Sequence, residues 1–144
     1  MERLQTELIA AMKAGEGIRV ETIRMLLTAL KNATIDAPNH LLTEADEIAI
    51  VSREAKKRSE SIEIFNKGGR SDLAEHEQRQ LDVLKIYLPV QASDDEIEVV
   101  IKEVINDLGS RANFGSVMKA SMTKLAGRTD GNKVSSMVKL MLQT

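Results

Sequence analysis

Five cationic side chains near the C-terminus are the residues whose type and spacing point most clearly to chemistry, and that chemistry is the binding of phosphate. They are Lys119, Lys124, Arg128, Lys133 and Lys139. Asp130 is the only acid between positions 111 and 144, and with Arg111 this stretch carries a net charge of +5. Cations gathered in this way are typical of surfaces that bind nucleic acid.

A turn between two predicted helices brings part of this charge together. Asp130 and Gly131 favour the start of a helix, whose first N–H groups attract anions, and Arg128 and Lys133 flank that start. The chain has only three aromatic residues, so stacking on single-stranded bases is not expected. The pattern therefore predicts contact with the backbone and shape of a structured RNA.

An alternative use of the same cations remains open at this stage. Residues 71–110 contain ten acidic residues against three basic ones, whereas residues 1–70 are neutral. The C-terminal lysines can therefore pair with a preceding acidic helix, through Glu96, Glu98, Glu103 or Asp107. In that case the fold itself neutralises much of the charge.

A second basic group predicts a solvated helix face. It comprises Arg53, Lys56, Lys57 and Arg58. Glu54, Glu60 and Glu63 lie at spacings that allow pairing within one helix, which would absorb much of this charge.

Other polar residues give no catalytic or metal-binding pattern. His40 and His76 have no histidine partner four residues away, and the chain has no cysteine, so no metal site is predicted. Acids at 46–47 and 94–96 fit the first turns of helices, where they complement the helix dipole. Since no nucleophile–base set or phosphate loop is present, we expect no cofactor and no activity from the chain alone.

Apolar residues repeat with helical spacing along nearly the whole chain, which predicts an all-α fold. We expect an up-and-down bundle of about four helices over residues 1–90 and a smaller three-helix unit over residues 91–144. Pro89 favours a break between them, because proline cannot continue a helix. The predicted N-caps are Thr43, Ser71, Ser93, Asn113 and Asp130, and Glu96 completes a capping box with Ser93.

Two features of composition bear on partners and compartment. The sequence lacks the apolar run of ~18 residues that a membrane span requires, and it lacks a signal-peptide pattern, so we expect a cytoplasmic protein without a membrane partner. Methionines at 118 and 122, and at 137 and 141, are spaced one helical turn apart. They either fill the core of the smaller unit or line an adaptable groove for another protein.

Five stretches of the sequence resemble the YqeY family over essentially the whole chain. They are IRMLLTALKN at 23–32, GRSDLAE at 69–75, IYLPVQ at 86–91, FGSVMK at 114–119 and GRTDG at 127–131. Ser116 stands where family members often carry lysine, which would weaken or move the basic patch.

The resemblance implies a function that the residues alone do not give. The family shares a helical domain with GatB, a subunit of the tRNA-dependent amidotransferase, whose tail contacts the outer elbow of tRNA. The resemblance implies two helical units and an association with tRNA or with glutamine-dependent carbon–nitrogen ligation. The catalytic centres of that enzyme lie outside the shared domain. We therefore expect a tRNA-binding accessory module, or alternatively an adaptor that docks on an amidotransferase or synthetase through the methionine-rich helices.

Overall fold

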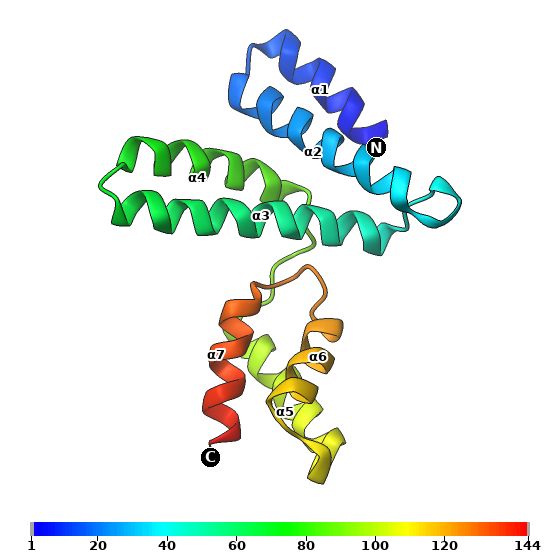
Figure 1. Cartoon of the computed structure of the whole chain (residues 1–144), viewed down its shortest axis with the longest axis vertical. Helices are drawn as coiled ribbons and strands as arrows, with labels where there is room; N and C mark the ends of the chain where they lie inside the picture. The colour runs from blue at the N-terminus through cyan, green and yellow to red at the C-terminus, as the bar shows by residue number, and fades with distance from the viewer. Residues whose placement is uncertain (1, 144) are drawn as a thin grey trace. The chain divides into compact units, whose positions relative to one another are not determined.

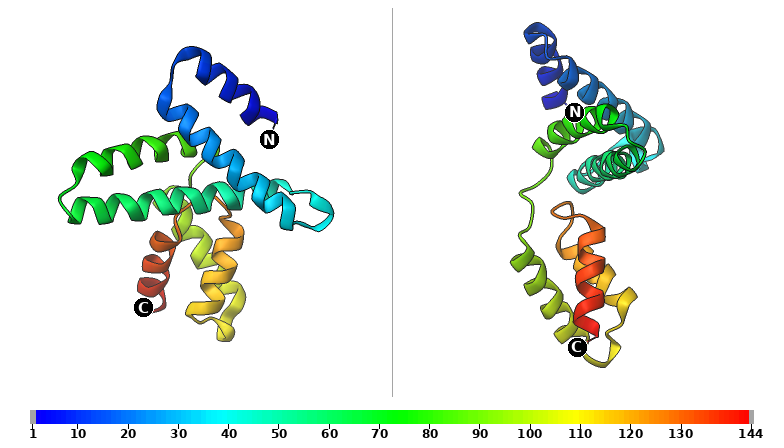
Figure 2. Two further views of the ribbon diagram at one scale, coloured as in Figure 1. Left: turned by 45° about the horizontal axis from the view of Figure 1, so that its top comes forward. Right: turned by 90° about the vertical axis from the view of Figure 1, so that its left-hand side faces the viewer.

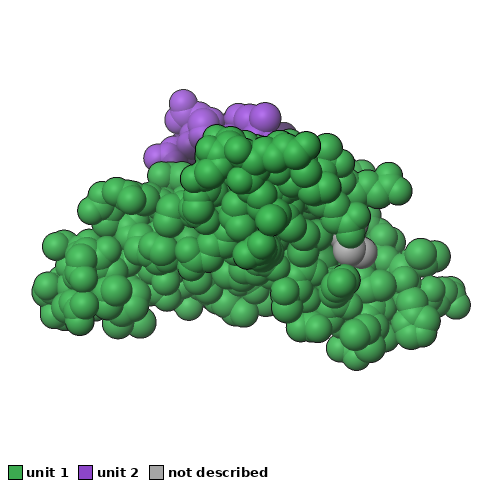
Figure 3. All heavy atoms as spheres, turned by 90° about the horizontal axis from the view of Figure 1, so that it is seen from above, with its two compact units in different colours: residues 1–88 green, residues 89–144 purple. Residues whose placement is uncertain are grey.

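The computed structural model describes residues 2–143 and confirms the all-α fold class. Seven α-helices and two short 3-10 helices account for the regular structure of these residues, among which there is no strand. The chain forms two compact units, residues 1–88 and residues 89–144, which Figure 3 colours separately. The second unit begins at Pro89, two residues before the predicted boundary.

The first unit consists of two helical hairpins. Its helices are α1 (Glu2–Ala14), α2 (Gly17–Asp36), α3 (Glu44–Lys67) and α4 (Ser71–Ile86). Helix α1 pairs with α2 and helix α3 pairs with α4, while α2 also packs against both α3 and α4. Figures 1 and 2 show α2 running across the α3–α4 hairpin at an angle. Helix α2 therefore joins the two hairpins into one unit.

The buried core of the first unit is aliphatic. Leu26 and Ile23 of α2 and Leu84 of α4 are completely buried in it. Burying one such side chain contributes about 1.5–3 kcal/mol, so this core supplies much of the stability of the unit.

Arg53, Lys56 and Lys57 are exposed, as predicted for a solvated face, but Arg58 joins a polar network that crosses between α3 and α4. Arg58 lies 3.3 Å from a carboxylate oxygen of Glu77 and donates to the side-chain carbonyl of Gln80 at 3.3 Å. Its guanidinium also lies 3.9 Å from the carboxylate of Glu54. That contact and the pair between Lys57 and Glu54 at 3.2 Å are the intrahelical pairing that was expected. Sequence spacing identifies partners within one helix but not across two.

Tyr87 ties the end of α4 to α1. Its hydroxyl donates a hydrogen bond to Glu7, and the guanidinium of Arg3 lies 5.2 Å from the centre of its ring. Burial, and then the bond to Glu7, raises the pKa of the Tyr87 phenol. The same bond lowers the pKa of Glu7.

Most helices are capped by the residues that the sequence predicts. The Thr43 hydroxyl accepts from the Asp46 N–H at 3.1 Å, and the Asp46 carboxylate accepts from the Thr43 N–H at 2.9 Å. That second bond lowers the pKa of Asp46. The predicted cap at Ser71 is wrong, because Ser71 is already the first helical residue and Arg70 occupies the cap position without a side-chain bond.

The second unit is a three-helix arrangement around its own core. Its helices are α5 (Asp94–Leu108), α6 (Phe114–Lys124) and α7 (Gly131–Leu142), shown in Figure 1. Each helix packs against the other two. The core includes Ile97, Ile101, Val117, Val134 and Val138, all completely buried. The partly buried Met118, Met122, Met137 and Met141 pack against it, which matches the core interpretation of the methionines.

Candidate RNA-binding surface

The turn between α6 and α7 positions the central part of the predicted basic cluster. Asp130 caps α7 by accepting from the Asn132 N–H at 3.0 Å, as the sequence predicts. Gly127 has φ 71°, in the left-handed region that glycine enters most readily. The chain can therefore reverse sharply just before Arg128.

Arg128 is held by the segment that precedes α5. Its Nε donates to the Val90 carbonyl at 2.8 Å, and its guanidinium donates to Glu96 at 2.7 Å. The Arg128 carbonyl accepts from the Ala92 N–H at 2.7 Å, and the Gly127 carbonyl accepts from the Gln91 side chain at 3.1 Å. Arg128 therefore joins the start of the second unit to its α6–α7 turn, and its guanidinium is already engaged.

The engagement of Glu96 explains why the predicted capping box at α5 is only half formed. The Ser93 hydroxyl accepts from the Glu96 N–H at 3.2 Å, as expected. The Glu96 carboxylate turns to Arg128 rather than back to the Ser93 N–H. The bond to Arg128 is the main reason that the pKa of Glu96 is lowered.

Two more predicted cations face acids of α5. Lys133 lies 2.5 Å from a carboxylate oxygen of Asp94. Lys124 lies 3.9 Å from Asp107 and 4.0 Å from Glu103. The side chains in these pairs keep between 45% and 71% of their surface exposed, so each pair contributes about 0–1 kcal/mol. The pairing with α5 that the sequence left open is thus present, but it is weak.

The remaining predicted cations have no acidic partner within 4.0 Å among residues 2–143. Lys119 is exposed on α6, and Lys139 is exposed on α7. The ammonium of Lys139 lies 5.7 Å from the centre of the Phe114 ring at the start of α6. Arg111, which was not among the predicted site residues, is exposed just before that start and also lacks an acidic partner in the described chain. In the sequence, Arg111 could be recognised only as one of the basic residues of positions 111–144, which carry a net charge of +5.

Ser116 forms part of the N-terminal cap of α6. Its Oγ accepts from the Asn113 N–H at 3.0 Å, and the Asn113 side chain accepts from the Ser116 N–H at 2.9 Å. This capping box fixes the start of α6 beside Arg111. A lysine at position 116 would add charge but would lose the reciprocal bond.

The charge of the second unit as a whole is balanced. Residues 89–144 contain seven basic and seven acidic side chains, because α5, with six acids and one lysine, offsets the +5 of the last stretch. A ligand therefore meets local groups of cations on α6 and α7 instead of a uniformly positive unit.

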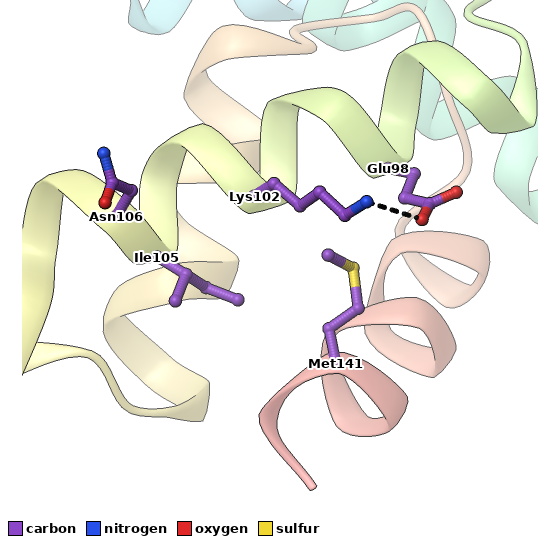
Figure 4. Close-up of a pocket in the computed structure, with 5 residues that line it drawn as sticks. All are labelled: Glu98, Lys102, Ile105, Asn106 and Met141. Atoms are coloured by element: carbon purple, nitrogen blue, oxygen red, sulfur yellow. Dashed lines mark ion pairs between the residues drawn. The ribbon is translucent and has the colours of Figure 1, made fainter. Parts of the chain in front are cut away.

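A shallow hollow of about 410 Å³ lies between α5 and α7. Figure 4 shows Met141 of α7 opposite Glu98 and Lys102 of α5, which pair with each other at 3.2 Å. Ile105 and Asn106 complete the lining. The two charged groups satisfy each other, and the lining supplies no nucleophile with a base beside it.

The histidines and acids of the described chain do not gather for metal binding. His76 contacts a carboxylate oxygen of Glu21 on α2 at 3.3 Å, and His40 is exposed in the 3-10 turn Pro38–His40. No group of three or more potential ligand residues lies within reach of one ion among residues 2–143. Within the same residues, no helix has both the length and the apolar character needed to cross a bilayer.

The fold and this surface define a class: an all-α protein of two helical units, the second of which displays exposed cations on two of its helices. The model of the family described as Yqey-like protein matches residues 1–142. The chain belongs to this family, which confirms the resemblance seen in the sequence motifs.

Curated relatives from fungi carry a mitochondrial name. The chain is 34% identical over 142 residues to "Altered inheritance of mitochondria protein 41, mitochondrial" of Lachancea thermotolerans, covering 94% of this chain and 75% of that protein. It is 32% identical over 143 residues to the protein of the same name in Pyrenophora tritici-repentis, covering 96% of this chain and 78% of that one. These names describe the relatives and state no ligand or reaction.

Proposed function

We propose that the protein is an accessory module that binds structured RNA, tRNA in particular, through the phosphate backbone. The observation that carries the proposal is that Arg111, Lys119 and Lys139 are exposed on the second unit without an acidic partner among the described residues. Such cations neutralise phosphates when RNA binds, and they do not read base sequence.

We give the predicted site residues different roles according to their contacts. Lys119 and Lys139 are free to contact phosphate, whereas Lys124 and Lys133 must first leave weak pairs with α5. Arg128 is assigned to the architecture of the second unit, because its bonds to Val90 and Glu96 hold the α6–α7 turn.

Family membership supports the choice of tRNA. The chain belongs to the YqeY family, and the resemblance to the GatB tail implies an association with tRNA-dependent amidation, so a tRNA that awaits amidation is the proposed ligand. An amidotransferase or synthetase would supply the chemistry. The cytoplasm is the proposed compartment for this chain, and the mitochondrion is the compartment named for the fungal relatives.

The test is a titration of bulk tRNA with the wild type and with a Lys119→Ala/Lys139→Ala variant. Each lost phosphate contact should reduce the steepness of log affinity against log salt by about 1, so the double variant should lose about 2. The loss should be similar for all tRNAs, because backbone contacts carry no sequence information.

A matched control removes two cations from the first unit. Lys13→Ala/Lys31→Ala changes the net charge equally, and both lysines are exposed without an acidic partner in the described chain. If the control variant loses as much affinity as the test variant, the assignment to the second unit is wrong. If the wild type binds no tRNA at about 50 mM salt, RNA binding is refuted and the adaptor function becomes the better hypothesis.

A further inference from the structure

The acids of α5 occupy positions at which an RNA phosphate would be bound. Asp94 contacts Lys133 near the start of α5, and Glu103 and Asp107 contact Lys124 near its end. All five side chains are exposed, so a ligand can reach the cations without opening the core. A carboxylate and a phosphate oxygen make the same kind of charged hydrogen bond to an ammonium group.

We infer that RNA binds the second unit by exchange, in which backbone phosphates replace Asp94 at Lys133 and replace Glu103 and Asp107 at Lys124. The inference rests on the proposed function and adds its mode of regulation. Helix α5 acts as an internal competitor that lowers the affinity of the second unit for RNA.

The two ion pairs that would be exchanged are separated by most of the length of α5. Asp94 and Asp107 are 13 residues apart in one helix, which corresponds to about 20 Å at the usual rise of 1.5 Å per residue. At about 3.6 residues per turn the two acids also lie on different sides of α5, so Lys133 of α7 and Lys124 of α6 are two separate points of exchange. Lys119 and Lys139 contribute contacts that need no exchange.

Exchange has a distinctive salt dependence. A phosphate that meets a free lysine releases a condensed cation from the RNA, which makes the affinity fall with salt. A phosphate that displaces a carboxylate also releases a condensed cation from the RNA. The carboxylate that it displaces then attracts a cation from the solution. The wild type should therefore show a flatter salt dependence than its number of contacts suggests.

The experiment compares tRNA binding by the wild type and by Asp94→Asn/Glu103→Gln/Asp107→Asn. The variant leaves Lys124 and Lys133 without competitors. We expect a tRNA affinity between about 3- and 30-fold higher than that of the wild type at low salt, because two weak pairs no longer have to be broken. The log–log salt slope should steepen by about 1–2.

The control is Glu60→Gln/Glu63→Gln/Asp95→Asn, which changes the net charge by the same amount. These three acids are exposed and contact no cation among the described residues, so the control frees no lysine. Circular dichroism checks that each variant folds. If the triple variant does not fold, Asp94→Asn alone gives the same test at Lys133.

The outcomes separate the inference from the function. A higher affinity with a steeper slope in the test variant, and not in the control, supports exchange. Equal affinities of wild type and test variant, or an equal gain in the control, overturn exchange and leave RNA binding intact. No binding by any of the three proteins at low salt overturns the proposed function as well.

Discussion

The two units contain the same kinds of charged side chains but place them differently. In the first unit, Arg58, Glu54 and Glu77 lie between α3 and α4, with their side chains only 11% to 20% exposed. In the second unit, the pairs of Lys124 and Lys133 with α5 lie at the surface. A charge that is largely buried must keep its partner, whereas an exposed one can change partners at little cost. The comparison assigns a structural role to the pairs of Arg58, and it agrees with the proposed exchange at Lys124 and Lys133.

The largest effect should come from removing the cation that is largely buried. Arg58→Ala leaves Glu54 and Glu77 near the interior without their common partner, and it should lower the free energy of unfolding of the first unit by about 2–3 kcal/mol. Urea unfolding followed by circular dichroism measures this. Arg53→Ala on the same helix, where the side chain is exposed, should change stability by less than about 0.5 kcal/mol. If the two substitutions lower the free energy of unfolding equally, the ion pairs of Arg58 do not have the structural role given to them.

A smaller loss of stability is expected when Arg128 is replaced. Its side chain is less exposed than those of Lys124 and Lys133 in the same unit. Arg128→Ala loses the charged hydrogen bond to the Val90 carbonyl and should destabilise this unit by about 1–2 kcal/mol. Hydrogen exchange should show faster opening of residues in α5 to α7 and no change in α1 to α4. Arg111→Ala, which removes an exposed cation, should leave exchange unaltered. Protection that persists in Arg128→Ala would show that Arg128 is free to bind a ligand.

The smallest predicted effect is a change in the stability of the second unit at acidic pH. Because Arg128 lowers the pKa of Glu96 in the folded protein, the resulting stabilisation is fully present above the unfolded pKa of about 4.3. It is lost as the pH falls through the lowered folded value. The difference in melting temperature between wild type and Glu96→Gln should therefore shrink between about pH 5 and pH 3. A difference that stays the same from about pH 5 to pH 3 would contradict this role of Arg128.

The fold could be predicted because it depends on local patterns. The spacing of apolar residues gave all seven helices, and most caps followed from a single side chain such as Thr43 or Asn113. Ser71 was misassigned because a serine fits both the cap and the first turn, and only backbone geometry distinguishes the two positions.

The candidate site could be predicted only in part. The sequence identified the cations of α6 and α7, but it could not decide which of them face α5. That choice depends on how three helices pack, which brings Glu96 to Arg128 across 32 positions and leaves Lys119 unpaired in the described chain. The polar network of Arg58 was missed for the same reason, since Gln80 lies 22 positions away on another helix.

Tyr87 has a practical consequence for spectroscopy. The chain contains one tyrosine and no tryptophan, so Tyr87 is the sole source of tyrosine fluorescence. Its ring packs at the core of the first unit, and its hydroxyl is bonded to Glu7 of α1. Fluorescence excited in the near ultraviolet therefore reports the loosening of α1 from the end of α4. The second unit contributes no such emission, and its unfolding has to be followed through the peptide backbone.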